Sequence, residues 1–165
     1  MADAQTPDFD EHREPSPAHG GLFVPDGFEI PAPPGHARFV LEPLSPEHND
    51  ADYAAWTSSV DHIHATPGFE HGRWPHPMTL EENRGDLVMH ARHFAERRGF
   101  TYTVLDPTTR DVIGCVYIYP SEDPTIDAQV RSWVRVSSAG LDDVLAVHVQ
   151  DWLDVAWPFT SVSYR

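Results

Sequence analysis

The sequence contains no lysine, and all eleven of its basic residues are arginine. The absence of lysine excludes every mechanism that forms a Schiff base on the protein. With 26 acidic residues the chain carries a formal net charge of −15 at pH 7. Such a charge repels nucleic acids and anionic membranes, so we expect neither as a partner. A cationic or amine ligand would be attracted by the same field.

Cysteine and long hydrophobic runs are scarce as well. The single cysteine, Cys115, excludes an intramolecular disulfide, and its apolar neighbourhood at 112–119 favours a buried thiol over a nucleophile. No apolar run approaches the ~20 residues of a membrane-spanning helix. The first residues have neither the basic segment nor the apolar core of a secretory signal, so we expect a cytoplasmic protein.

Proline is concentrated near the start of the chain, because nearly half of its sixteen prolines lie in residues 1–35. Such a composition buries too little apolar surface to fold alone. We expect a partly disordered tail, mobile up to about Gly20, with 22–24 and 28–30 docked on a domain formed by residues 36–165.

From His36 onward, the hydrophobic pattern becomes regular. Capping signals at Ser45 and Thr79 start two helices, the first with its inner face running to Ile63 and the second with its inner face running to Ala95. A third helix spans 141–157, where apolar residues recur at helical spacing. Alternating or continuous apolar runs predict strands at 37–44, 100–106, 112–119, 128–136 and 161–164.

The order strand, two helices, three strands, helix, strand resembles the GNAT superfamily of N-acetyltransferases. The likeness covers residues 37–165 and includes the segments Tyr102–Pro107 and Val112–Ile118. It implies an α+β fold with three α/β/α layers, in which helices cover both faces of a mixed, mostly antiparallel sheet of about five strands. It also implies transfer of an acetyl group from acetyl-CoA to a small amine, with no metal cofactor.

In that family the cofactor's pantetheine arm lies between the fourth and fifth strands, and its pyrophosphate binds amides at the start of the next helix. The resemblance therefore implies these cofactor-binding residues: Val134, Arg135, Val136, Ser137, Ser138, Ala139 and Gly140. Free N–H groups and the helix dipole favour an anion at such a position.

Two features depart from the family pattern. The loop Arg135–Gly140 has one glycine where the family has two, and Asp142 and Asp143 follow in the first turn of the helix. The family also continues past the fifth strand with another helix and two strands, whereas this sequence ends at Arg165. We therefore expect a homodimer that covers the last strand, unless residues 22–35 do so. The alternative function is a catalytically inactive GNAT-like fold that binds a ligand or a protein partner.

Acyl transfer to an amine needs a general base and an acid for the leaving thiolate. The candidates lie near where the substrate would bind, and they are Glu122, Asp127, Tyr117 and Tyr164. Substrate-binding candidates are Trp74, Arg131 and Trp133, since arginine holds carboxylates and the family often builds its acceptor pocket at the position of Trp74. For each, the alternative is ordinary packing or ion pairing.

Histidines cluster in the loop around residues 62–77 and on the second helix. A His-x-His pair with further histidines is compatible with a zinc or nickel site. The loop has no cysteine and few acids, so we expect solvated histidines without a metal. The residues concerned are His62, His64, His71, His76, His90 and His93.

Overall fold

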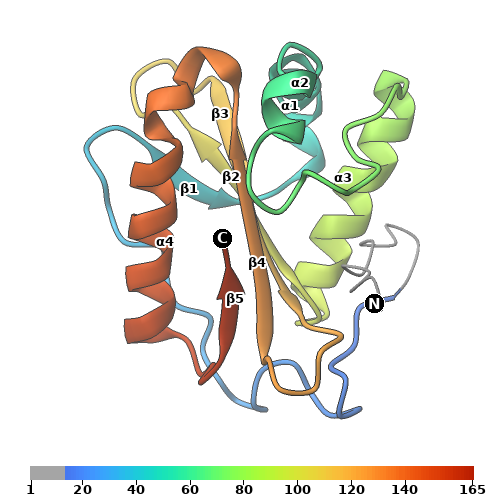
Figure 1. Cartoon of the computed structure of the whole chain (residues 1–165), viewed down its shortest axis with the longest axis vertical. Coiled ribbons are helices and arrows are strands. Elements are labelled where there is room, and N and C mark those ends of the chain that lie inside the picture. The colour runs from blue at the N-terminus through green and yellow to red at the C-terminus, as the bar shows by residue number, and fades with distance from the viewer. Residues whose placement is uncertain (1–13) are drawn as a thin grey trace, which may run out of the picture.

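The computed structural model describes residues 14–165, and it contains one five-stranded sheet (Figure 1). The predicted disorder of residues 1–13 lies outside the described residues. The strands follow one another in space as they do in sequence, with β1–β4 antiparallel and β5 parallel to β4. Their bounds are β1 Val40–Pro43, β2 Phe100–Leu105, β3 Val112–Pro120, β4 Ala128–Val134 and β5 Val162–Tyr164.

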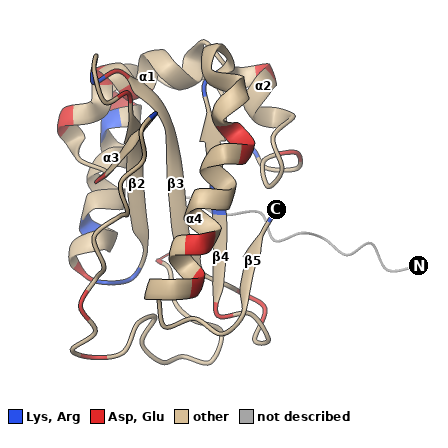
Figure 2. Ribbon diagram, turned by 90° about the vertical axis from the view of Figure 1, so that its left-hand side faces the viewer, with Lys and Arg blue, Asp and Glu red and all other residues tan. Residues whose placement is uncertain are grey.

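Helices cover both faces of this sheet, as predicted for the α+β fold. The helices α1 (Asn49–Thr57), α2 (Val60–His64) and α3 (Leu80–Ala95) pack on one face, and α4 (Asp142–Ala156) packs on the other. Both predicted caps form, because Ser45 and Thr79 each accept a hydrogen bond from a backbone amide and complete a capping box. Acidic residues occur on every α-helix of the described chain (Figure 2).

Strand β3 lies between two hydrophobic cores. Val116 and Ile118 point into the core beneath α4, while Cys115 points into the core beneath α1 and α3. Eight of its nine residues are buried, which explains why the sequence is apolar on both faces there.

Two predicted elements have different bounds in the structure. The first predicted helix is divided into a 3₁₀ turn, η1 (Pro46–His48), followed by α1 and α2. Strand β4 ends at Val134 instead of residue 136, because Val136–Leu141 forms a second 3₁₀ segment, η2. Residue 136 donates its amide hydrogen to Ser59 Oγ at 2.9 Å, so the chain leaves the sheet plane at this point.

Residues 23–30, which precede the sheet, pack on the core beneath α4. Val24 is buried, and the ring of Phe23 stacks against Phe100 and Phe159 with centroids 5.9 and 5.0 Å apart. Phe28 and Ile30 pack on the same core. No described helix has the length and apolar character needed to cross a membrane. The predicted homodimer stays a prediction.

The close approach of β3 to β4 at Gly114 predicts a strong effect of one substitution. A Cβ at Gly114 would lie 2.0 Å from the carbonyl oxygen of Trp133, so we expect Gly114→Ala to lower the free energy of unfolding by about 3 kcal/mol. Gly85, inside α3, has open space around it, and Gly85→Ala should raise the same quantity by up to about 1 kcal/mol. Urea unfolding measures the free energy of unfolding of both variants. If the two substitutions changed it equally, the tight β3–β4 contact at Gly114 would be contradicted.

Candidate functional site

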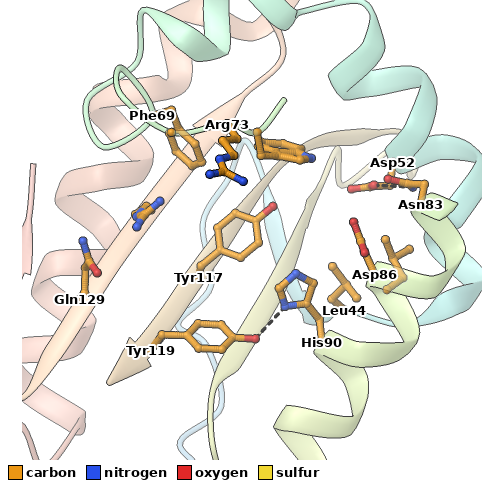
Figure 3. A pocket seen from close by; sticks show the side chains of 14 residues that line it. Leu44, Asp52, Phe69, Arg73, Asn83, Asp86, His90, Tyr117, Tyr119 and Gln129 are labelled. Carbon is orange, nitrogen blue, oxygen red and sulfur yellow. Dashed lines mark hydrogen bonds between the residues drawn. The ribbon is translucent and has the colours of Figure 1, made fainter. Parts of the chain in front are cut away.

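A pocket opens on the face of the sheet that α1 and α3 cover (Figure 3). It has a volume of about 70 Å³, room for roughly five waters at ~10–15 Å³ each, and it is open on one side. Its walls come from α1, α3, the segment 69–74 and the strands β3 and β4. The lining residues are Leu44, Asp52, Phe69, Gly72, Arg73, Trp74, Asn83, Asp86, Leu87, His90, Tyr117, Tyr119, Gln129 and Arg131.

A buried amide network joins α1 to α3 at the inner end of the pocket. The side-chain amide of Asn83 donates to Asn49 Oδ1 at 2.8 Å and to Asp52 Oδ2 at 3.1 Å. Its carbonyl oxygen accepts from Trp56 Nε1 at 2.9 Å. Asn83 therefore uses both ends of its amide, and this network fixes α3, which carries Asp86 and His90, against α1.

Asp52 is a buried carboxyl group in this network. Burial raises its pKa to about 6, the hydrogen bond from Asn83 lowers it in part, and the nearby charge of Asp86 raises it again. Asp52 and Asp86 together give the α-helical side of the pocket a negative potential. The cations Arg73 and Arg131 belong to other parts of its wall.

Aromatic side chains form the wall below the 69–74 segment. Trp74 lies 5.7 Å from Trp133 and 5.9 Å from Phe69, measured between ring centroids. Trp133 Nε1 donates to the hydroxyl of Tyr117 at 3.1 Å. The structure thus brings the predicted substrate residues Trp74, Trp133 and Arg131 to one region, with Trp133 buried behind Trp74. Burial raises the pKa values of Tyr117 and Cys115.

His90 lies at the floor of the pocket. Its Nδ1 is 2.7 Å from the hydroxyl of Tyr119 and 3.2 Å from Thr101 Oγ1, and its other ring nitrogen points into the pocket (Figure 3). Burial lowers the pKa of His90 to about 3, and the neighbouring His93 contributes to the shift. His90 is therefore neutral at physiological pH.

At the opposite edge of β4, the pairing with β5 is short. Strand β5 pairs only with Ala128–Val130, and among the described residues no strand pairs with the rest of β4 on that side. The hydroxyl of Tyr164 lies 2.6 Å from Ser132 Oγ. Arg165 donates to the carbonyl oxygen of Ser132 at 3.3 Å and to both carboxylate oxygens of Asp142 at 2.5 and 2.8 Å.

The predicted cofactor-binding loop lies between this edge and α4. Within it, Ser138 N donates to the carbonyl oxygen of Arg135 at 2.9 Å, and the Arg135 side chain turns back toward Val112. Val134 is buried in the core beneath α4. By contrast, Ser137, Ala139 and Gly140 are exposed, as is the side chain of Val136.

The predicted catalytic residues are not gathered at one place. Tyr117 lines the pocket, and Tyr164 lies at the β4–β5 edge. Glu122 and Asp127 lie outside the pocket lining, in or beside the β3–β4 connection. Asp127 Oδ2 accepts three hydrogen bonds from Thr160 and Ser161, which lower its pKa and anchor the turn before β5.

Sequence reasoning missed the role of several pocket residues. Asp52 and Asn83 are polar residues on otherwise amphipathic helices, and Asp86 is one acid among many in this sequence. His90 and His93 carried a signal in their i, i+3 spacing, but we considered them only as metal ligands. Within residues 14–165 the structure gathers no group of three or more His, Cys, Asp or Glu side chains suited to a metal.

Comparisons with known proteins place this arrangement among acetyltransferase structures. No protein-family model and no curated protein matches the sequence. RimL, described as a ribosomal L7/L12 alpha-N-protein acetyltransferase, shares 14% identity over 81% of this chain and 70% of its own, with a TM-score of 0.57. Its complex with coenzyme A shares 13% identity over 74% of this chain and 67% of its own, with a TM-score of 0.58. Ribosomal-protein-S5-alanine acetyltransferase from Vibrio fischeri shares 13% identity over 72% of this chain and 65% of its own, with a TM-score of 0.56.

These likenesses, at low identity, establish the fold. The chain has the fold of acetyltransferases, and the predicted GNAT-type α+β architecture is confirmed. On that fold this protein carries the pocket with Asp52, Asp86 and His90, and the Arg165–Asp142 pair beside β4.

The buried carboxyl group of Asp52 predicts a pH-dependent cost to stability. Because its folded-state pKa is raised, the folded protein holds the proton more tightly, so ionisation between pH 4 and 7 destabilises the fold. We expect the wild type to lose about 2 kcal/mol relative to Asp52→Asn over that range, because burial raises the pKa of Asp52 from 3.8 to about 6. Urea unfolding at both pH values measures this, with exposed Asp50→Asn as the control. If the difference in unfolding free energy between wild type and Asp52→Asn were the same at both pH values, the burial of the Asp52 charge would be contradicted.

Proposed function

We propose that this protein transfers an acetyl group from acetyl-CoA to a small amine held in the pocket. One observation carries the proposal: the pocket reaches β4 at the point where β5 stops pairing with it. Pairing ends at Val130, and the pocket is lined by Gln129 and Arg131 on either side of that residue. An extended chain lying along β4 past Val130 would bring its end beside the pocket.

The pocket lining supports an amine as the acceptor. Asp52 and Asp86 attract a cation to the helical side of the pocket, while Arg73 and Arg131 line other parts of its wall. The rings of Trp74 and Tyr117 in the lining favour an ammonium group through cation–π contact. The net charge of −15 draws cations toward the whole molecule. RimL and the Vibrio fischeri enzyme are described as acting on ribosomal proteins, so a peptide with a free amino terminus belongs in the same test as small amines.

The loop between β4 and α4 supports a phosphate-binding role in part. Exposed Ser137, Ala139 and Gly140 precede the helix, and the guanidinium of Arg165 lies beside its first turn. Acetyl-CoA supplies an activated acyl group as a thioester. The carboxylate of Asp142 already occupies the Arg165 guanidinium, however, and competes there with any phosphate. This ion pair therefore weakens phosphate binding at the loop.

The same ion pair favours a second candidate function. With Arg165 hydrogen-bonded to Ser132 O and to Asp142, the edge of β4 is partly covered. A protein that keeps this contact would hold an amine in the pocket without acyl transfer. The two functions differ in whether acetyl-CoA binds, so binding is the measurement that separates them.

The Asp142 carboxylate gives the first test. We expect Asp142→Asn to bind acetyl-CoA roughly tenfold more tightly than the wild type, because it removes a negative charge beside the phosphates and releases Arg165. Calorimetry measures the affinity, and the thermal shift with cofactor should rise in parallel. The matched control is Asp143→Asn, one residue along the helix. If none of the three proteins binds acetyl-CoA at millimolar concentration, the second candidate function, amine binding without acyl transfer, is favoured.

The pocket carboxylates give the second test. Asp86→Asn keeps the side-chain size and removes one charge, so we expect KM for a cationic amine to rise roughly tenfold, equivalent to about 1.4 kcal/mol. Release of free thiol from acetyl-CoA over a panel of amines, amino acids and short peptides reports the reaction. Glu81→Gln, exposed at the start of the same helix, should leave KM unchanged. A KM equally insensitive to both substitutions would place the amine elsewhere.

A further inference from the structure

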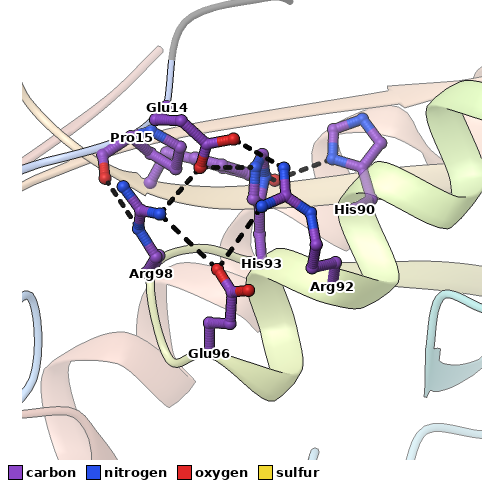
Figure 4. Close-up of polar contacts among 8 residues, drawn as sticks. Glu14, Pro15, His90, Arg92, His93, Glu96 and Arg98 are labelled. Atoms are coloured by element: carbon purple, nitrogen blue, oxygen red, sulfur yellow. Dashed lines mark hydrogen bonds and ion pairs between the residues drawn. The ribbon is translucent and has the colours of Figure 1, made fainter.

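A line of polar groups runs from the pocket through the protein to the segment before the sheet (Figure 4). It begins at His90, whose Nδ1 lies 2.7 Å from the hydroxyl of Tyr119. The same hydroxyl lies 3.1 Å from Nδ1 of buried His93. On its far side, Nε2 of His93 is 3.7 Å from a carboxylate oxygen of Glu14. Glu14 is about half exposed, so the line ends at solvent.

Hydrogen-bond arithmetic restricts how protons are arranged along this line. The Tyr119 hydroxyl has one hydrogen and faces two Nδ1 atoms, so at least one imidazole must donate to it. Burial lowers the pKa values of both His90 and His93, so neither ring is protonated twice at neutral pH. At least one ring therefore donates through Nδ1, and the other accepts there when Tyr119 gives its hydrogen to that ring instead of to Thr101.

The carboxylate of Glu14 selects between the two arrangements. Its negative charge, 3.7 Å away and not hydrogen-bonded to the ring, favours a hydrogen on Nε2 of His93, which leaves Nδ1 of His93 as the acceptor for the Tyr119 hydroxyl. The oxygen of Tyr119 then accepts from Nδ1 of His90. His90 is left with an unprotonated Nε2, the ring nitrogen that points into the pocket.

Glu14 is held in the charged form and in a fixed place by two arginines. Its carboxylate oxygens accept from Arg92 at 2.6 Å and from Arg98 at 2.7 Å, and the hydrogen bond from Arg92 is the main cause of its lowered pKa. Arg98 also donates to the carbonyl oxygen of Pro15. Glu96 lies 3.7 Å from Arg92 and 3.5 Å from Arg98, and so balances part of their charge.

We propose that His90, Tyr119, His93 and Glu14 form a proton relay that removes the proton of the amine during acyl transfer. This inference rests on the proposed function. As the amine nitrogen bonds to the acyl carbon, the carbon–sulfur bond breaks and the sulfur leaves with its electron pair. The N–H proton of the amine joins Nε2 of His90, and Nδ1 of His90 passes its own proton to Tyr119. Tyr119 passes one to Nδ1 of His93. Nε2 of His93 has no hydrogen-bond partner among the described residues and lies 3.7 Å from Glu14, so it gives its proton to this carboxylate when the two groups close to hydrogen-bond distance, and Glu14 releases the proton to solvent.

The relay explains how a poorly basic imidazole can serve as the base. No charged imidazolium needs to persist, because each ring gains one proton and loses another, and both finish as the opposite neutral tautomer. The groups that face His90 from its surroundings are Thr101 on β2, Tyr117 and Tyr119 on β3, and Asp86 and His93 on α3. Thr101 Oγ1, at 3.2 Å from Nδ1 of His90, hydrogen-bonds to the same nitrogen.

Tyr119→Phe interrupts the line with the loss of one oxygen atom. We expect kcat to fall about 100-fold, in the range of general-base contributions, while KM changes less than twofold. The matched control is Tyr102→Phe, since Tyr102 is buried in the other core and its hydroxyl has no hydrogen-bond partner. It should keep kcat within twofold. Equal losses in the two variants, or a change confined to KM, would overturn the relay.

Glu14→Gln tests the selection of the tautomer at a surface residue. Nitrogen-15 NMR of the histidine rings should show His90 carrying its hydrogen on Nδ1 in the wild type and shifting toward Nε2–H in the variant, with kcat about tenfold lower. The NMR measurement needs no activity. A wild type that transfers no acetyl group but shows this tautomer pattern would remove the proposed function alone. A wild-type His90 with its hydrogen on Nε2 would overturn the relay, whatever the activity.

Discussion

The burial of β3 on both faces is the constraint from which the rest of the architecture follows. A strand with eight of nine residues buried needs a helical layer on each side, and α4 supplies one layer while α1 and α3 supply the other. Gly114 adds a second requirement, because only glycine lets the backbone of β3 approach β4 so closely. The α1–α3 layer leaves the gap beneath residues 69–74 that becomes the pocket, so this core and the site share one face.

Strand β4 separates the two halves of the candidate site. Its side chains on one face contribute Gln129 and Arg131 to the pocket, and its backbone edge beyond Val130 faces Arg165. An acceptor and an acyl donor could therefore approach the same strand from different directions, one from a sheet face and the other from a sheet edge. The Asn83 network fixes the pocket side, whereas Arg165 and Tyr164 hold the edge side through their contacts with Asp142 and Ser132.

Hydrophobic spacing was enough to predict the order of strands and helices, because each element buries one stripe or two faces. The family resemblance added Trp74 to the candidate group, and the alternation of the strand at 128–136 added Trp133. The site itself could not be predicted in full, since its contacts depend on how α3 lies against β3. The meeting of His90 and His93 with Tyr119 joins residues 26 and 29 positions apart in sequence. Glu14 belongs to a stretch without periodicity, where sequence gives no indication of contact with α3.

The N-terminal segment packs on the sheet and helices that follow it. The regular hydrophobic pattern starts near His36, and a boundary drawn from sequence would fall there. Cutting at that boundary would expose Phe100 and Phe159, which Phe23 now covers, and would also remove the carboxylate that holds Arg92 and Arg98. A protein shortened in this way would thus expose apolar surface that favours aggregation, and it would lose Glu14 from the line of polar groups that starts at His90. The smallest unit that retains the whole site is longer than its sheet and helices.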